Sequence, residues 1–219
     1  MLRASGAISV DGRLDEPAWQ RAFELPLVDA MDGSPPRRST VARLLWDDRY
    51  LYVAFEAEGG EGSARPSRGD GGPAREEEAV ALLVDATGTG RGFVEVEVSA
   101  DNAHADTRFE PGPGDLAEAR AWVSGARTAT QFHRGAPGEG GFTVEMAVPL
   151  LSLRGSGPLP RPGDRWRANL YRIEVDGREG SRKGQAFSPP LRGDLHVLDR
   201  LGWLVFDGGA LPPVASRTP

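Results

Sequence analysis

The segment Phe93–Ser99 alternates apolar and polar residues without a break, and this pattern constrains the fold of the chain more than any other. Valines occupy positions 94, 96 and 98, and Glu95, Glu97 and Ser99 stand between them or follow them. Successive side chains of a β-strand point to opposite faces of a sheet. We therefore expect the valines to face a core and the two glutamates to lie on the opposite, polar face.

An uninterrupted apolar run at 80–84 precedes this segment and is joined to it by the glycine-rich stretch 85–92. The run has no alternation, which favours a strand covered on both faces, with a short buried helix as the alternative. Two strands joined by a glycine-rich loop predict a hairpin. This hairpin carries both core and polar surface, so it is a frame for a binding face.

Similar short segments recur along the chain, and its 29 glycines and 18 prolines favour turns over long helices. The pattern predicts an all-β fold: a single antiparallel β-sandwich, jelly-roll-like, of about ten or more short strands. One domain is expected over 1–209, with a flexible tail at 210–219. The further strands are expected at 40–46, 51–57, 122–123, 128–132, 142–148, 165–175 and 201–206, and 177–184 is expected to be a charged loop.

One or two short helical turns are expected besides the strands. Asp15 can cap the first of them, in which Trp19 and Phe23 lie four residues apart on one face and cover a sheet edge. The second is expected at 150–153, directly after Pro149.

Composition excludes several classes of function. The net charge is −6 and the basic residues form no stripe, which speaks against a nucleic-acid partner. There is no cysteine, so disulfides and thiolate metal sites are excluded. No run approaches the roughly 18–20 apolar residues of a membrane span, and no apolar secretory signal opens the chain. We expect a soluble protein, either cytoplasmic or trimmed from an exported precursor.

Two patterns, a pair of carboxylates and a glycine-rich loop, are similar to known functional motifs. Glu95 and Glu97 are roughly 6–7 Å apart on one strand face, a spacing that a glycosidase acid and base can have, but a solvated polar face is favoured. A small glycosidase would need Glu95 or Glu78 opposite a second carboxylate. Residues 88–92 are similar to a phosphate-binding loop but lead into a strand and lack the Lys-Ser/Thr continuation, so a hairpin turn is favoured.

Other polar and aromatic residues have open roles. The three histidines, His104, His133 and His196, fall in different predicted loops, and a shared metal site would require all three loops to converge. Arg172 is expected to bond a ligand hydroxyl or, preferably, to pair with Glu95 or Glu97. Three of the five tryptophans, Trp19, Trp46 and Trp203, are expected to pack in the core. If Trp122 or Trp166 is exposed, it would provide a stacking platform for a ligand.

The order of these segments resembles the family 9 carbohydrate-binding module and its relatives. The resemblance covers roughly residues 7–206 and rests on six phrases, namely ISVDGRLDEPAWQRA, TVARLLWDDRYLYVAFEAE, EEEAVALLVDATGTGRGFVEVEVSADN, GFTVEMAVPL, GDRWRANLYRIE and LHVLDRLGWLVF. It implies a β-sandwich that holds a glycoside hydrolase against a polysaccharide and carries no catalysis itself. It also implies an extracellular or periplasmic setting.

In this family two tryptophans clamp a terminal sugar and polar side chains bond its hydroxyls. The resemblance places Arg75 at the first tryptophan, Ala81 at a glutamate, Glu97 at an arginine, Ser99 at an amide and Phe187 at the second tryptophan. Only an aromatic ring at 187 remains. The module therefore binds a different ligand through other residues of the same face, or has become a structural spacer.

These considerations give the candidate sites. We expect a saccharide to be bound by Phe187, Glu95, Glu97, Asn102 and Arg172. The alternative is a structural or protein-interaction domain without sugar binding, which would present an apolar patch to a protein partner. The family resemblance also implies calcium as a candidate cofactor, with oxygen ligands from Asp101, Asn102 and Asp106.

Overall fold

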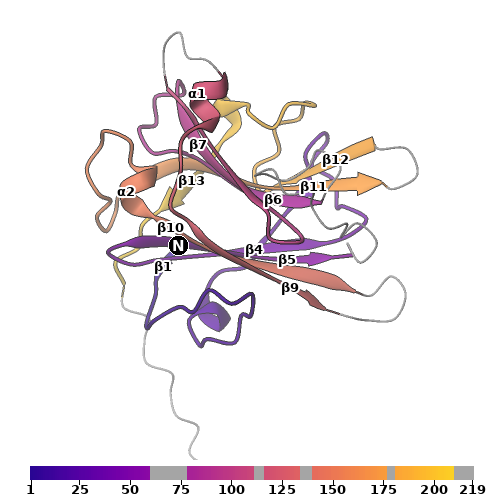
Figure 1. The fold of residues 1–219 in the computed structure, drawn as a ribbon, viewed down its shortest axis with the longest axis horizontal. Helices are drawn as coiled ribbons and strands as arrows, with labels where there is room; N and C mark the ends of the chain where they lie inside the picture. Colours follow the sequence, from indigo (N-terminus) through magenta and orange to yellow (C-terminus); the bar gives the residue numbers. More distant parts are fainter. Residues whose placement is uncertain (60–77, 111–115, 134–139, 177–180, 210–219) are drawn as a thin grey trace, which may run out of the picture.

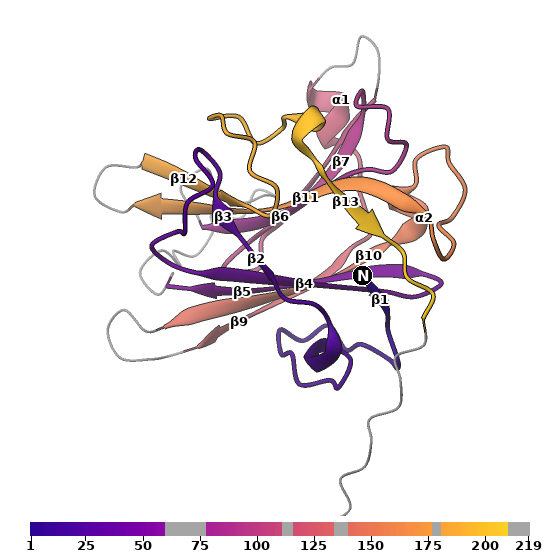
Figure 2. The ribbon, with the colours of Figure 1, turned by 180° about the vertical axis from the view of Figure 1, so that it is seen from behind.

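The computed structural model describes residues 1–59, 78–110, 116–133, 140–176 and 181–209. Within these residues the strands form two sheets that pack face to face (Figures 1 and 2). This confirms the predicted all-β sandwich. Arg75 and the expected tail at 210–219 lie outside the described residues. None of the described helices has the length and apolar character needed to cross a membrane.

Sheet A is built around the predicted hairpin of 40–46 and 51–57. Its strand order is β1-β4-β5-β10-β9, with β2 also paired to β4. All pairings are antiparallel except that of β1 with β4. The strands are β1 (Leu2–Arg3), β2 (Leu25–Pro26), β4 (Thr40–Trp46), β5 (Tyr50–Glu58), β9 (Arg127–His133) and β10 (Gly141–Pro149).

Sheet B contains the predicted hairpin of 80–84 and Phe93–Ser99. Its order is β3-β12-β11-β6-β7-β8, with β13 also paired to β11, so β8 is an edge strand of the described sheet. The strands are β3 (Val28–Asp29), β6 (Ala79–Asp85), β7 (Phe93–Ser99), β8 (His104–Phe109), β11 (Arg165–Asp176), β12 (Ser181–Ala186) and β13 (Gly202–Val205).

The main core lies between the two sheets. Val94, Val96 and Val98 of β7 point into it, while Glu95 and Glu97 do not, as the alternation predicts. Every residue of β6 is buried, which confirms that this apolar run is covered on both faces. Burial stabilises each such Val or Leu side chain by about 1.5–3 kcal/mol, so the alternation fixes the face that each strand turns inward.

The glycine-rich stretch after β6 is a hairpin turn, as favoured. The carboxylate of Asp85 accepts hydrogen bonds from the backbone amides of Thr87, Gly88 and Gly90. β6 and β7 on either side pair antiparallel. The backbone amides of this loop therefore close the turn. A phosphate-binding loop would keep such amides free for its ligand.

Helical structure is short, as expected, but the first turn differs from the prediction. It is a 3-10 turn, η1 (Trp19–Arg21), with Ala18 rather than Asp15 at its N-cap position. Trp19 is buried, whereas the Phe23 side chain is 62% exposed. The prediction for Phe23 was wrong because the turn ends before a residue four positions after Trp19 can return to the same face. The other helical segments of the described residues are α1 (Leu116–Arg120), α2 (Leu150–Leu153) and η2 (Leu198–Arg200).

Three further predictions were wrong. Residues 122–123 are not a strand, and part of the expected loop at 177–184 is strand β12. Trp203 is 55% exposed instead of buried in the core. In β13, Trp203 pairs in register with Arg167, and both lie on the face of sheet B opposite to Trp166 and Leu204, which belong to the core. The Arg167 guanidinium covers the Trp203 ring at 4.9 Å.

The N-terminal segment covers the outer face of sheet A. Ile8, Ala18 and Trp19 pack there against Leu45 and Tyr52 in a second apolar cluster. At Gly12, φ is +85° and an added Cβ atom would lie 2.9 Å from the Thr130 carbonyl carbon of β9, so only glycine permits this close approach. Trp19 therefore packs on the flat face of the sheet and not along an edge.

Candidate binding site

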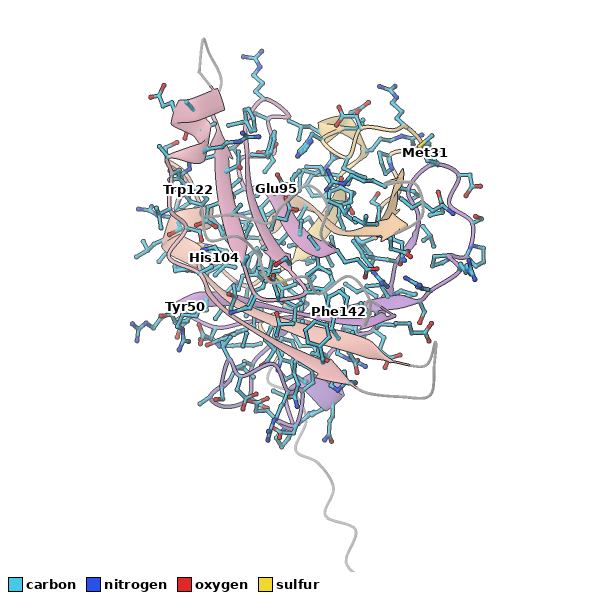
Figure 3. All side chains as sticks on the ribbon, turned by 45° about the vertical axis from the view of Figure 1, so that its right-hand side comes forward. Met31, Tyr50, Glu95, His104, Trp122 and Phe142 are labelled. Atoms are coloured by element: carbon cyan, nitrogen blue, oxygen red, sulfur yellow. The ribbon has the colours of Figure 1, made fainter. Side chains whose placement is uncertain are left out.

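A groove of about 810 Å³ lies over the outer face of sheet B. In Figure 3, Glu95, His104 and Trp122 lie in the same part of the molecule, on β7, β8 and the segment after α1. We refer to the following residues as the groove: Glu95, Glu97, His104, Ala105, Asp106, Thr107, Arg120, Trp122, Val123, Ile173, Arg182, Lys183, Gly193, Asp194, Leu195 and His196.

Strand register explains the floor of the groove. Glu97 of β7 has Ala81 of β6 as its cross-strand partner on one side and Ala105 of β8 on the other. Cross-strand partners have their Cβ atoms about 4.5–5.5 Å apart, so the Glu97 carboxylate stands between two methyl groups. Short neighbours leave the space above it open.

The groove continues around the free edge of sheet B. Ala105 and Thr107 share the outer face with the glutamates, whereas His104 and Asp106 of the same strand are in register with the core-facing Val98 and Val96. Both sets line the groove. Residues from both faces of β8 can reach the groove because no further strand of the described sheet pairs with β8 on that side.

Trp122 lies beside this edge, held by the segment between α1 and β9. The Arg108 guanidinium lies 4.4 Å from the centre of its ring. Nearby, the Ser124 backbone amide and hydroxyl donate hydrogen bonds to the two oxygens of Asp106, at 2.7 and 2.9 Å. These contacts fix the segment against β8 and place a partly buried indole at the groove.

The two floor glutamates have different environments. Glu95 contacts Nε2 of His196 at 3.1 and 3.2 Å, and this hydrogen bond is the main cause that raises the pKa of His196. Burial, followed by the nearby charge of Glu95, raises the pKa of Glu97 to about 7, although Arg182 and His196 act in the opposite direction. Glu97 therefore exchanges its proton near neutral pH.

This raised pKa predicts a pH dependence of stability. A carboxyl whose folded-state pKa lies above its ordinary value of 4.5 contributes stability that is present below pH 4.5 and lost as the pH rises through about 7. From pH 5 to pH 8 we expect the wild type to lose roughly 2–3 kcal/mol of unfolding free energy more than Glu97→Gln. Urea unfolding of both proteins at the two pH values measures this difference.

The other charged groups of the groove are present in both proteins, so they do not cause the expected difference. They are Glu95, His104, Asp106, Arg120, Arg182, Lys183, Asp194 and His196. Parallel pH profiles for wild type and Glu97→Gln would contradict the raised pKa.

Only two of the five predicted ligand-binding residues line the groove, namely Glu95 and Glu97. Asn102 is exposed in the turn between β7 and β8, and its side-chain amide lies 3.5 Å from the Thr128 carbonyl oxygen. The Phe187 ring packs against the main core beside Gly202. Their roles in ligand binding stay predictions, but the structure does not place them together.

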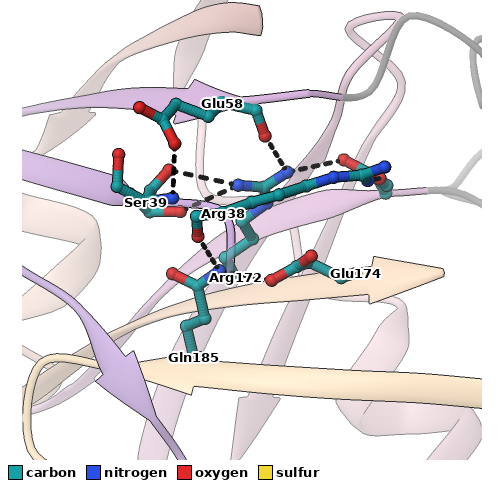
Figure 4. Close-up of polar contacts among 8 residues, drawn as sticks. Arg38, Ser39, Glu58, Arg172, Glu174 and Gln185 are labelled. Atoms are coloured by element: carbon teal, nitrogen blue, oxygen red, sulfur yellow. Dashed lines mark hydrogen bonds and ion pairs between the residues drawn. The ribbon is translucent and has the colours of Figure 1, made fainter. Parts of the chain in front are cut away.

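Arg172 lies between the sheets with 0% of its side chain exposed, so the expected ion pair with Glu95 or Glu97 was wrong. It shares the core face of β11 with Leu170 and is in register with Val80, whereas the two glutamates point outward. Its Nη2 atom binds Glu78 at 2.9 Å and the Glu58 carbonyl oxygen at 2.7 Å (Figure 4). Its Nη1 atom binds the Thr40 hydroxyl at 3.0 Å.

The three calcium candidates have separate hydrogen-bond partners. Asp106 accepts from Ser124, and Asp101 accepts from the Ser99 hydroxyl. The described part of the chain contains no group of three or more His, Cys, Asp or Glu residues that could hold a metal ion. Calcium therefore stays a prediction from the family resemblance. The histidines also have different neighbours, since His133 contacts Thr143 in sheet A and His196 contacts Glu95 in sheet B.

Sequence reasoning missed one wall of the groove. Arg182 and Lys183 belong to β12, which was expected to be a loop, and Asp194 and His196 lie in the segment after it. Residues 181–184, Ser-Arg-Lys-Gly, show no alternation of apolar and polar residues, so no local pattern indicated β12. No local pattern indicates where the segment 187–201 folds back over the sheet.

Comparisons with known proteins bear on the fold. No family model matches the sequence, and no curated protein matches it. A solved structure does match: a carbohydrate-binding module of family 9 from Caldicellulosiruptor kristjanssonii in complex with cellotriose has a TM-score of 0.63 at 17% identity, covering 100% of this chain and 99% of that one. The chain has the fold of a family 9 carbohydrate-binding module.

Two further structures agree with this family 9 fold. A complex of a family 9 module from the same organism with glucose gives a TM-score of 0.64 at 16% identity, covering 96% of both chains. A protein from Bacteroides uniformis ATCC 8492, assigned only provisionally to carbohydrate binding, gives 0.63 at 17% identity, covering 86% of this chain and 88% of that one. These structures support the expected β-sandwich architecture.

Proposed function

We propose that this chain is a non-catalytic carbohydrate-binding module of the family 9 type and that a saccharide occupies the groove on sheet B. The groove itself is the observation that carries the proposal. Its volume of about 810 Å³ lies within the range of roughly 300–1,000 Å³ typical of ligand sites. Solved modules with the same fold are complexes with cellotriose and glucose, which favours a saccharide over other small molecules.

The groove residues suit the two kinds of surface that a sugar presents. Glu95 and Glu97 can accept hydrogen bonds from hydroxyl groups, and Arg182 can donate to hydroxyl and ring oxygens. Trp122, Val123 and the apolar Ile173 offer surface for the C–H faces of pyranose rings. Polar and apolar groups therefore line the same space.

The specificity is expected to differ from that of the family because the centre of the face is covered by the chain itself. Leu195 and Leu198 pack on Leu83 and Tyr171. The Tyr171 hydroxyl also donates to the Leu195 carbonyl oxygen. The position of the family glutamate, Ala81, lies in the same apolar cluster. The open part of the face is thus shifted toward β7 and β8.

Calorimetric titration with cellotriose, xylotriose and mannotriose tests this function. We expect at least one trisaccharide to bind and Trp122→Ala to weaken it about tenfold or more, equivalent to roughly 1.4 kcal/mol. Trp203→Ala is the matched control, because this exposed tryptophan lies on β13, outside the groove, and its loss should leave affinity unchanged. Absence of heat for every saccharide tested at millimolar concentration would remove the proposal.

A protein-interaction role is the second candidate, and one observation favours it. Trp203 and Val205 are both exposed on β13, a short strand that pairs with β11 outside the main strand order of sheet B. This role predicts that Trp203→Ala and Val205→Ser abolish capture of a partner protein while leaving any saccharide binding intact.

A glycosidase role can be tested through Glu95, which faces the groove together with Glu97. The proposed binding function predicts that the protein does not hydrolyse oligosaccharides, either with Glu95 or with Glu95→Gln. Hydrolysis by the wild type that is lost in Glu95→Gln would establish the enzyme instead.

A further inference from the structure

The position of Glu97 sets the chemistry of the groove floor. Its register partners on both neighbouring strands are alanines, Ala81 and Ala105. No long side chain of β6 or β8 therefore stands directly beside the carboxylate on the outer face. The carboxylate is partly buried in the floor and faces a groove with room for a ligand group.

Glu95 already has a hydrogen-bond partner within the chain. His196 approaches both of its carboxylate oxygens, at 3.1 and 3.2 Å. For Glu97, by contrast, the described residues provide no hydrogen bond and no ion pair within 4.0 Å, and the positive charge of Arg182, which also lines the groove, acts on it only from a longer distance. The described structure thus gives Glu95 a direct partner and leaves direct contact with Glu97 to the ligand.

The two carboxylates also act on each other. They are roughly 6–7 Å apart along one strand face, and a second negative charge at that distance disfavours ionisation of a partly buried carboxyl. A cation placed beside Glu97 relieves both the burial of its charge and the repulsion from Glu95. An ammonium group does this best, because it offers three donors and a full charge.

We propose that the groove selects saccharides that carry a free, protonated amino group, which binds against Glu97 with Glu95 beside it. The ligand class is a deacetylated amino-sugar oligomer. This inference rests on the proposed function and adds a specificity determinant to it. A neutral sugar offers Glu97 only hydroxyl donors, and a uronic acid brings a third carboxylate to the floor.

A lysine-containing peptide has the same charged group, but the groove favours a saccharide. Trp122, Val123 and Ile173 give apolar surface beside the carboxylates, which suits stacked sugar rings. The fold is also that of modules solved with cellotriose and glucose. A peptide is therefore treated as an outcome of the test.

The test compares the affinities of five probes by calorimetry at pH 6.5. They are the glucosamine trimer, the N-acetylglucosamine trimer, cellotriose, the galacturonic acid trimer and an end-capped trilysine peptide. We expect the glucosamine trimer to bind at least about tenfold tighter than the N-acetylated trimer and cellotriose, since an ion-paired hydrogen bond is about twice as strong as a neutral one. The galacturonic acid trimer and trilysine should bind most weakly.

A matched pair of variants assigns the preference to Glu97. Glu97→Gln keeps the size of the side chain and removes its charge, and it should bring the affinity ratio of glucosamine trimer to cellotriose close to one. Asp48→Asn makes the same charge change at an exposed turn of sheet A, where Asp48 pairs with Arg3, and should leave the ratio unchanged. Melting curves confirm that each variant is folded.

The outcomes separate this inference from the proposed function. If cellotriose and the glucosamine trimer bind equally, or if Glu97→Gln keeps the preference, the inference is overturned and the proposed function stands. Tightest binding of the galacturonic acid trimer has the same consequence. Binding of trilysine as tightly as the glucosamine trimer overturns selection of a saccharide. If no saccharide binds, both fail.

Discussion

Replacing Arg172 with methionine is expected to lower the free energy of unfolding by about 3–5 kcal/mol, because it leaves the buried carboxylate of Glu78 with only the half-exposed Arg38, 3.4 Å away, as a partner. The pair lies between the sheets with 0% and 1% of the two side chains exposed, and its nitrogen and oxygen are 2.9 Å apart. The same guanidinium binds the Thr40 hydroxyl and the Glu58 carbonyl oxygen, so it joins the ends of β4 and β5 to β11. Urea unfolding measures the loss.

A double variant and a surface pair serve as controls. Arg172→Met combined with Glu78→Met should recover most of the lost stability, since two apolar residues replace a buried ion pair at little net cost. Asp48→Asn removes the exposed ion pair with Arg3 and should cost less than about 1 kcal/mol. A loss of under 1 kcal/mol for Arg172→Met would show that this pair does not tie the sheets together.

Glu145→Ala is expected to have the second large effect, a loss of about 3–5 kcal/mol, because it leaves three donors without their acceptor, two of them in buried hydrogen bonds. Glu145 of β10 is 0% exposed. Its carboxylate accepts hydrogen bonds from the backbone amides of Asp11 and Gly12 at 2.9 and 2.8 Å, and from the Trp19 indole at 2.9 Å. These bonds attach the N-terminal segment to the outer face of sheet A.

Hydrogen exchange locates this effect. The amides of Asp11 and Gly12 should lose protection in Glu145→Ala, while those of β6 and β7 in the other sheet keep it until global unfolding. Glu24→Ala, which removes an exposed partner of Arg43, provides the comparison and should change stability by less than about 1 kcal/mol. Unchanged protection at Asp11 and Gly12 would mean that the segment is held by apolar packing alone.

Much of the fold could be predicted because its strands have strong local patterns. The alternation in Phe93–Ser99 and the hairpin of β4 and β5 identified both elements and the faces that they bury. Predictions failed where the burial of a residue depends on how its strand pairs with a neighbouring strand. Trp203 is exposed because β13 pairs with β11 in a register that turns it outward, and the sequence of β13 alone does not specify this register.

The candidate site could be predicted only in part. Glu95 and Glu97 follow from the alternation, and they line the groove. The predicted pair of Arg172 with these glutamates was wrong because Arg172 shares a face of β11 with Trp166 and Leu170, and the structure turns that face toward the core. By contrast, His196 reaches Glu95 from 101 residues away through a segment without repeating pattern. Such a contact depends on the path of a loop, which local residues do not determine.

The family resemblance extends to the fold but not to the expected ligand positions. Solved family 9 modules share the architecture over 96–100% of this chain at 16–17% identity. The resemblance places Ala81, Glu97, Ser99 and Phe187 at the positions of the family's sugar-binding groups. Core positions need only apolar residues of suitable volume, whereas ligand positions determine specificity and change with the ligand.

The most direct test of saccharide binding in the groove is a titration followed by ¹H–¹⁵N correlation spectra. Cellotriose and the glucosamine trimer are added in turn to labelled protein. We predict shifts of the Trp122 indole signal and of the Glu95 and Glu97 amides. The indoles of Trp19 and Trp46, which bind Glu145 and the Asp207 carbonyl oxygen, should not move. No shifts with either saccharide, or shifts confined to Trp203 and β13, would contradict the account.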